Sequence, residues 1–295
     1  MKDTTDLFSE IKGRFYLIDS HSYIYRAFYA IHDLKNSKGQ MTNAVYGFTN
    51  MLLKILKEEK PDYIACAFDH PKPTWRAEEF NDYKIHRKPM PDDLKSQIPY
   101  IKEVVNGFNI PIFEMPGFEA DDLIGTIAKH VTEESLEVTI VSSDKDILQL
   151  VNGKIKVLND RGEKIYYDRD AVIEKMGVPP ENIPDFLALC GDSSDNIPGV
   201  DGIGQKGALN LITRFKTIEN LIENANEIKN EKQKKSIIEN KENALLSKRL
   251  AVIKTDVPFD IDIYDCRIKE FNREKLEQLF KELEFKGFLK DIVGA

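Results

Sequence analysis

The sequence predicts an α/β fold with a mainly parallel sheet, followed by a lobe made of helices. Two observations support this prediction. Short apolar runs alternate with segments of helical periodicity through the first half of the chain, as in proteins whose parallel strands are joined by helices. From about residue 168 the strand-like runs stop, and helical segments separated by Gly and Pro turns follow.

The first half contains four short apolar runs that are typical of strands. The longer segments around them carry the apolar spacing of amphipathic helices. The expected strands are residues 14–19, 63–69, 137–144 and 154–160, and the expected helices are residues 43–59, 92–108 and 120–134.

The second half is expected to be helical. We place its start near Gly177-Val178-Pro179-Pro180, which gives an α/β domain over residues 1–177 and a helical lobe over residues 178–295. The expected helices after the sheet are residues 168–177, 180–192, 205–215, 217–224, 241–253 and 273–283.

Composition favours a cytoplasmic globular protein. No stretch approaches the roughly 18 apolar residues of a membrane helix, and the polar, acidic start MKDTTDLFSE does not resemble a signal peptide. Cys66, Cys190 and Cys266 are far apart, which favours reduced, buried thiols over a zinc site. The net charge of −8 argues only weakly against a nucleic-acid partner, because bound cations partly neutralise a cluster of acids.

Three expected strands run into an aspartate: Asp19, Asp69 and Asp144. Ligands of open parallel sheets bind at the carboxyl ends of the strands, so these side chains could converge at one edge. The alternative for each is helix capping, because Asp is a favoured N-cap residue.

Further acids make capping alone a poor explanation. Three of them open the helix at residue 120, where they repel one another and call for a compensating cation. The whole acidic set is Asp19, Asp69, Glu119, Asp121, Asp122, Asp144, Asp146, Asp192 and Asp195. Hard oxygen ligands without matching His or Cys suit Mg²⁺ or Mn²⁺, and two such ions about 3.5–4 Å apart can drive phosphodiester hydrolysis. A solvated acidic surface is the alternative for the set.

A glycine-rich hairpin follows in the second lobe. Gly202, Gly204 and Gly207 match a dinucleotide fingerprint by spacing, but no strand precedes them. They link two helices over about residues 186–215, so their backbone N–H groups could approach a phosphate, with Lys206 adding a charge. A purely structural helix–turn–helix corner is the alternative.

A long connection over about residues 72–98 favours a functional loop or lid. Tyr83 offers a stacking face, while Lys84, Arg87 and Lys88 offer phosphate contacts; an exposed polar loop is the alternative. Trp75 is expected to be a packing anchor. Arg26, shortly after Asp19, could reach the same edge of the sheet, and His21, His70 and His86 are expected to be ordinary polar residues.

These motifs together resemble the 5′-nuclease domains of the flap endonuclease family, among them that of bacterial DNA polymerase I. The segments that carry the resemblance are YLIDSHSYIYRAFYA, AFDHPKPTWR, YKIHRKPMPDDLKSQI, PGFEADDLIGTIA, VSSDKDILQLV and GDSSDNIPGVDGIGQKGA. The resemblance implies a PIN-like nuclease core with a helical arch, and a helical lobe with a helix–hairpin–helix motif. It implies 5′-3′ exonuclease and 5′ flap endonuclease activity on DNA flaps, nicks and ends, including RNA primers on DNA.

The resemblance also implies roles for individual residues. The nine acids would hold two or more Mg²⁺ or Mn²⁺ ions, and Tyr83, Lys84 and Arg87 would contact the threaded strand. Arg26 would lie near the scissile phosphate, and the glycine hairpin would hold the duplex with a monovalent ion such as K⁺. We expect a monomer in primer removal and DNA repair, and the chain resembles either a stand-alone enzyme or a domain of a polymerase.

Three other functions fit parts of the sequence. A phosphatase with Asp19 as nucleophile leaves the hairpin and the basic loop without a purpose. A ribonuclease with the same acidic core would not require the helical lobe, and a non-catalytic DNA-junction binder would lack metal ligands.

Overall fold

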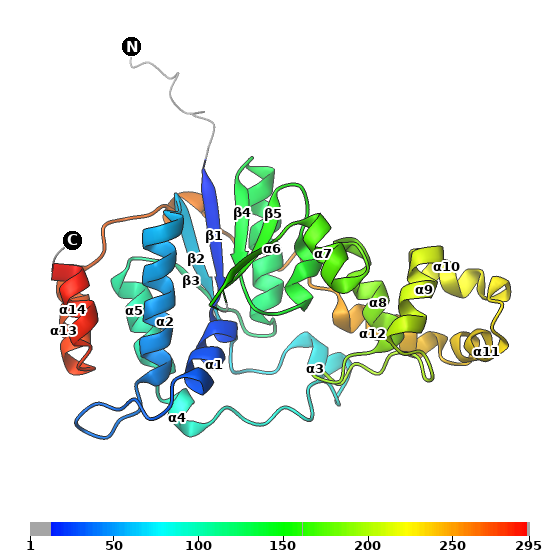
Figure 1. Ribbon diagram of the computed structural model, residues 1–295, viewed down its shortest axis with the longest axis horizontal. Helices are drawn as coiled ribbons and strands as arrows, with labels where there is room; N and C mark the ends of the chain where they lie inside the picture. The colour runs from blue at the N-terminus through cyan, green and yellow to red at the C-terminus, as the bar shows by residue number, and fades with distance from the viewer. Residues whose placement is uncertain (1–12, 161, 294–295) are drawn as a thin grey trace, which may run out of the picture.

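The computed structural model describes residues 13–160 and 162–293; the polar N-terminal segment considered above lies outside them. A six-stranded sheet in the order β3-β2-β1-β4-β5-β6 forms the centre of the first lobe (Figure 1). Its first five strands pair in parallel, and β6 pairs antiparallel with β5. The bounds are β1 Arg14–Asp19, β2 Tyr63–Ala67, β3 Ile112–Phe113, β4 Glu137–Val141, β5 Ile155–Asp160 and β6 Lys164–Tyr167. The predicted, mainly parallel sheet is confirmed, while β3 and β6 were not expected.

Helices cover both faces of the sheet because alternate residues of the strands are buried on opposite sides. On β1, Phe15 and Leu17 belong to one apolar cluster, and Tyr16 and Ile18 belong to the other. The second cluster includes side chains of α1 (Ser20–Ala30), α2 (Asn43–Lys54) and α5 (Ile98–Gly107), and the first includes those of α6 (Ala120–Glu133).

The second lobe extends from the sheet as a set of short helices (Figure 1). They are α7 Arg169–Met176, α8 Ile183–Cys190, α9 Gln205–Phe215, α10 Ile218–Glu223, α11 Glu231–Glu239 and α12 Lys241–Ala251. α7 begins at an Asp168 side-chain cap and ends at Gly177, whose φ of 76° suits a residue without a Cβ. α8 and α9 are joined by the turns of residues 191–204, so the hairpin links two helices as the sequence predicts.

The last two helices return to the first lobe. We expected everything after residue 177 to lie in the second lobe. Instead, α13 (Arg273–Glu282) packs against α5, and α14 (Lys286–Val293) lies beside α13 (Figure 1). Leu276 and Phe280 are fully buried in the cluster that contains α5. The apolar face of α13 therefore covers a side of α5 that would otherwise be exposed, which explains why this helix packs on the first lobe.

The long connection contains less helix than an arch implies. α3 (Trp75–Glu79) and α4 (Asp92–Lys95) are short, and residues 80–91 between them form turns and loop. Pro89 and Pro91 oppose a helix there because proline lacks an N–H donor and restricts the residue before it.

Five short elements complete the described part of the chain. They are the π-helical turn η1 Ile55–Glu59, which continues α2, and the 3₁₀ turns η2 Asp146–Leu150, η3 Pro180–Asn182, η4 Ala225–Glu227 and η5 Ile263–Cys266. No helix in the described residues is long and apolar enough to cross a membrane.

Candidate active site

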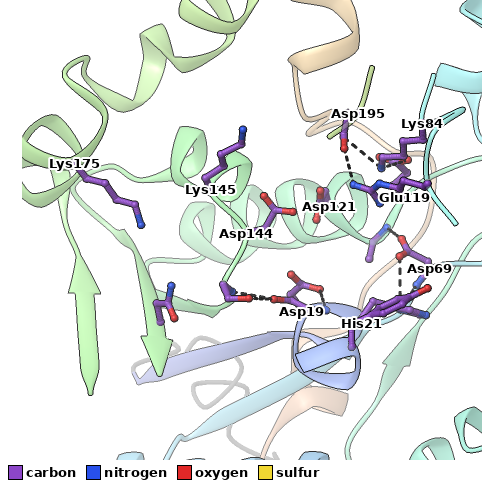
Figure 2. Close-up of a pocket in the computed structure, with 16 residues that line it drawn as sticks. Asp19, His21, Asp69, Lys84, Glu119, Asp121, Asp144, Lys145, Lys175 and Asp195 are labelled. Carbon is purple, nitrogen blue, oxygen red and sulfur yellow. Dashed lines mark hydrogen bonds and ion pairs between the residues drawn. The ribbon is translucent and has the colours of Figure 1, made fainter. Parts of the chain in front are cut away.

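A cavity of about 530 Å³ opens at the carboxyl edge of the sheet (Figure 2). Asp19 is the last residue of β1, Asp69 comes just after β2, and Asp144 comes just after β4, so the shared edge brings together the three strand-end acids. Six of the nine predicted acids line this cavity: Asp19, Asp69, Glu119, Asp121, Asp144 and Asp195.

Asp19 is the N-cap of α1, Asp69 accepts a bond from the first N–H of α6, and both line the cavity. Asp19 accepts hydrogen bonds from the Ser22 N–H at 3.2 Å and from the Ser142 hydroxyl at 2.6 Å. Asp69 accepts from the Ala120 N–H at the start of α6, at 2.8 Å. Burial, opposed by the Ser142 bond and reinforced by nearby acids, raises the pKa of Asp19 to about 7. For Asp19, helix capping and a place in the acidic site therefore coexist.

The adjacent acids Asp121 and Asp122, in the first turn of α6, have different surroundings. Burial, followed by the charges of Asp144 and Asp19, raises the pKa of Asp121 well above its ordinary value. Asp122 instead faces Arg76: its two oxygens accept from the guanidinium at 2.8 and 2.9 Å. It also accepts from the Trp75 indole N–H at 3.0 Å.

Asp122 is fully buried and accepts a further bond from the Lys254 N–H at 2.9 Å. We expected Asp122 to be one of the acids that hold the metal ions, but both of its oxygens are already bonded to protein donors. Asp122 is therefore a structural carboxylate in this structure, and Trp75 is the packing anchor that the sequence predicts.

Asp195 lines the cavity from the turns after α8, and Asp146, which opens η2, and Asp192 lie close to it. Asp146 Oδ1 is buried without a hydrogen-bond partner in the described residues, and burial, with the charge of Asp144, raises its pKa to about 7. Asp192 forms an ion pair of 2.6 Å with Lys145. The isolated bridge between Asp192 and Ile197 holds this turn in place.

The basic loop is folded onto the acids. Lys84 Nζ lies 2.6 Å from Glu119 and 3.6 Å from Asp195, and Arg87 lies 2.6 Å from Asp195. Tyr83 was expected to expose a stacking face, but it is buried, and its hydroxyl lies 3.2 Å from Glu119 and 3.1 Å from Asp195. Burying this ring covers its apolar body, and the two carboxylates satisfy its hydroxyl.

Lys88, Lys206, Gly202 and Gly204 remain exposed. Gly204 is the N-cap of α9, and Gly202 has a φ of 73°, which a side chain would disfavour. Gly207 lies within the first turn of α9, and a Cβ there would come within 3.1 Å of Gln233.

Arg26 does not line the acidic cavity. Its guanidinium donates to the Asp160 carbonyl and lies 5.7 Å from the Tyr23 ring centre. It borders a separate hollow between α1 and α2, so the expectation that Arg26 reaches the carboxylate edge does not hold in this structure.

Sequence reasoning missed several residues of the cavity. We expected His21 to be an ordinary polar residue, yet its Nδ1 accepts from the Asp69 N–H at 3.0 Å, and burial lowers its pKa. The other missed residues are Ser22, Tyr25, Ser143, Lys145, Asn159 and Lys175. Lys145 lies between the paired Asp144 and Asp146, which is a signal that the sequence did contain.

The donor set fits divalent cations of the hard type. The acids supply oxygen ligands only, and Asp146 has an orphaned buried oxygen. Burial, reinforced by repulsion from neighbouring acids, raises the pKa values of Asp121 and Asp146. Within the described ranges, no three His, Cys, Asp or Glu side chains are gathered closely enough to hold an ion as they stand. Lys84, Arg87 and Lys145 form ion pairs with three of the acids instead.

Residues 14–177 match the family model described as the 5′-3′ exonuclease, N-terminal resolvase-like domain. Residues 178–274 match the model described as the 5′-3′ exonuclease, C-terminal SAM fold. The chain is 43% identical over 279 residues to DNA polymerase I of Caldicellulosiruptor bescii, a match that covers 93% of this chain and 33% of that protein. It is 40% identical over 277 residues to the 5′-3′ exonuclease of Aquifex aeolicus, with 94% of each chain covered.

The chain thus spans about a third of the length of the polymerase relative and nearly the whole length of the exonuclease relative. Among solved structures, it is similar to a bacteriophage T5 flap endonuclease in a pseudo-enzyme–product complex with DNA and metal ions. That likeness has a TM-score of 0.69 at 20% identity and covers 95% of this chain and 98% of the other. It confirms the predicted fold class.

Proposed function

The chain belongs to the 5′-3′ exonuclease family, and we propose that it is a metal-dependent nuclease with both 5′-3′ exonuclease and 5′ flap endonuclease activity. The observation that carries this proposal is the convergence of six acids with Lys84 and Arg87 in one cavity at the carboxyl edge of the sheet. Relatives named as exonuclease and a similar flap endonuclease complex with DNA and metal ions support it.

We assign the cation ligands from burial and bonding. Asp19, Asp121, Asp144 and Asp146 would hold Mg²⁺ or Mn²⁺ most directly, because they are carboxylates without a basic partner within ion-pair distance among the described residues. Asp69, Glu119, Asp192 and Asp195 would bind the ions directly or through water. When bound, two cations would activate water and stabilise the leaving oxygen. Asp122 is left out of this set because Arg76 holds it.

Lys84 and Arg87 would act on the substrate phosphate. Their side chains already form ion pairs with Glu119 and Asp195. A small shift of the loop would therefore bring Lys84 and Arg87 to a phosphodiester bound in the cavity. Charged donors aimed at a phosphate stabilise the charge that develops during hydrolysis. Tyr83, buried between Glu119 and Asp195, would hold the loop in place beside the acids. The exposed Lys88 would contact the DNA strand farther from the cavity.

The hairpin would hold the duplex on which the flap is carried. Because they lack side chains, the glycines would let a DNA backbone approach the start of α9, where N–H groups favour an anion. These glycines are Gly202, Gly204 and Gly207. Lys206 would add a phosphate contact, and a monovalent ion such as K⁺ would bind at the same turn.

The biological setting that fits this activity is the removal of RNA primers and of flaps in DNA repair. We propose a monomer that works in the cytoplasm. Arg26 lies outside the acidic cavity, so we propose at most a contact with substrate beyond it.

The test is cleavage of a 5′-labelled flap duplex with Mg²⁺, with EDTA and an Asp144→Ala variant as controls. We expect short 5′ products from the wild type, none in EDTA, and turnover reduced by at least about a hundredfold in the variant, because a ligand of the ions is lost. Asp265→Ala removes an exposed acid far from the cavity and should cut like the wild type. Tight binding of the flap without cleavage, in Mg²⁺ and in Mn²⁺, would favour a DNA-junction binder.

A further inference from the structure

The cavity has a second side that the acids do not explain. Asn159 of β5 and Lys175 of α7 line it beyond β4, and Ser22 and Ser143 lie between them and the acids. In Figure 2, Lys175 reaches in from the side opposite Asp69 and His21, with Lys145 nearer to Asp144. This side holds no carboxylate of the predicted acidic set, so its chemistry differs from that of the cation site.

Asn159 is the buried polar group on this side. It stands near the carboxyl end of β5, next to β4 in the sheet, and only 7% of its surface is exposed. Its Oδ1 has no hydrogen-bond partner in the described structure. Leaving a buried amide oxygen unpaired is unfavourable, and this oxygen belongs to a side chain that lines an open cavity. The oxygen itself is covered in the unbound protein, so a donor of a bound molecule would reach it from the cavity only after the neighbouring side chains move apart.

Lys175 supplies a positive charge near this amide. It comes from α7, donates to the Tyr167 hydroxyl at 2.9 Å, and lies 4.3 Å from the Tyr167 ring centre. These contacts orient the ammonium without neutralising it. Lys84, Arg87 and Lys145 each form an ion pair with an acid, whereas no acid of the described residues lies within ion-pair distance of Lys175.

We propose that Asn159 and Lys175 form a nucleotide subsite next to the scissile phosphate, an inference that rests on the proposed nuclease function. Lys175 binds the phosphate of the neighbouring nucleotide, and Asn159 accepts a hydrogen bond from that nucleotide. The backbone of DNA has no such donor within a strand, whereas RNA offers a 2′-hydroxyl at each residue and several bases offer an amino group. The subsite would fix the strand one step from the acids.

The phosphate contact can be tested by binding alone, in EDTA at low salt. In each flap duplex of a series, a neutral methylphosphonate replaces one phosphate, and its position moves stepwise past the cut site. The affinity of each duplex is measured for the wild type and for Lys175→Met. We expect one position where the wild type loses about fivefold in affinity and the variant loses nothing. The variant should also lower the slope of log affinity against log salt by about 1.

Lys156→Met is the matched control, because Lys156 is an exposed lysine on β5 that does not line the cavity. It should keep the wild-type pattern of methylphosphonate losses. Equal thermal unfolding of the three proteins would show that the fold is intact. If the wild type and Lys175→Met show the same loss of affinity at each substituted position, Lys175 does not bind a phosphate there, and the proposed subsite is wrong.

The donor that meets Asn159 is identified with Asn159→Leu. Single ribonucleotides and single bases without an amino group are placed at the position found above. A wild-type preference for ribose that Asn159→Leu loses would identify the 2′-hydroxyl, and a lost preference for the amino base would identify the base. Equal affinity of both proteins for all of these substrates would overturn the role of Asn159. Because cleavage in Mg²⁺ is measured separately, a failed subsite and a failed nuclease proposal give different results.

Discussion

Replacing Arg76 by methionine should destabilise the protein more than the loss of an exposed charge would. Arg76 is 2% exposed, and its guanidinium bonds to Asp122, to the Leu250 carbonyl and to the Val252 carbonyl. It therefore joins α3 and the start of α6 to the chain at the end of α12. Methionine keeps much of the side-chain length and removes only the charge and its donors.

The magnitude follows from what the change leaves behind. Asp122 would remain fully buried without its cationic partner, and breaking a buried ion pair in this way costs about 3–5 kcal/mol. The Trp75 and Lys254 N–H groups still bond to Asp122, which keeps the expected loss within that range. In the Arg76→Met/Asp122→Leu double variant the charge buried at position 122 is gone, and Glu119, which also bonds to Arg76, keeps its ion pair with Lys84, so we expect part of the stability to return.

The assay is urea unfolding followed by circular dichroism at pH 7, with Arg169→Met as control. Arg169 forms an exposed pair with Glu181, and its loss should change the unfolding midpoint little. A loss below about 1 kcal/mol for Arg76→Met would refute the reasoning, since it lies well outside the range for a broken buried pair. So would a double variant less stable than the single one.

Three further predictions concern the site. Lys84→Met should bind Mg²⁺ about tenfold or more tightly by calorimetry, because a charge-assisted bond to an acid, worth about 1.5–3 kcal/mol, no longer competes with the ion; unchanged affinity would contradict this. Lys206→Ala should weaken duplex binding and reduce its salt slope by about 1, with cleavage at saturating DNA little changed; an identical slope would argue against the hairpin contact. In EDTA, Asp19 and Asp146 have pKa values raised to about 7, so the folded state holds extra protons and stability should fall as pH rises from about 4 to 7. Asn at either position should flatten that fall in urea unfolding, and a rise over this window would contradict the assignment.

The sequence predicted the sheet and the strand-end acids because both depend on local patterns. Parallel strands end at one edge of a sheet, so Asp19, Asp69 and Asp144 could be grouped without knowing the packing. Asn159 was not predicted because it carries an amide and not a carboxylate, although it lies near the carboxyl end of β5, at the same edge of the sheet.

Other features depended on tertiary contacts that no local pattern contains. Successive residues of a helix point about 100° apart, so Asp121 faces the cavity while Asp122 faces Arg76. Tyr83 is buried only because its loop folds onto Glu119 and Asp195. The periodicity of residues 273–283 predicted a helix but not that it would pack against α5.

The Arg76 contacts have a consequence for the nascent chain. The acids of the sheet edge emerge from the ribosome long before Asp195 and the carbonyls of Leu250 and Val252 that receive Arg76. A partly synthesised chain therefore has strand-end acids but neither the hairpin acids nor the bonds that fix α3 against α6. The order of synthesis thus withholds the complete acidic site, and the bonds that fix α3 beside it, until about 250 residues have been made.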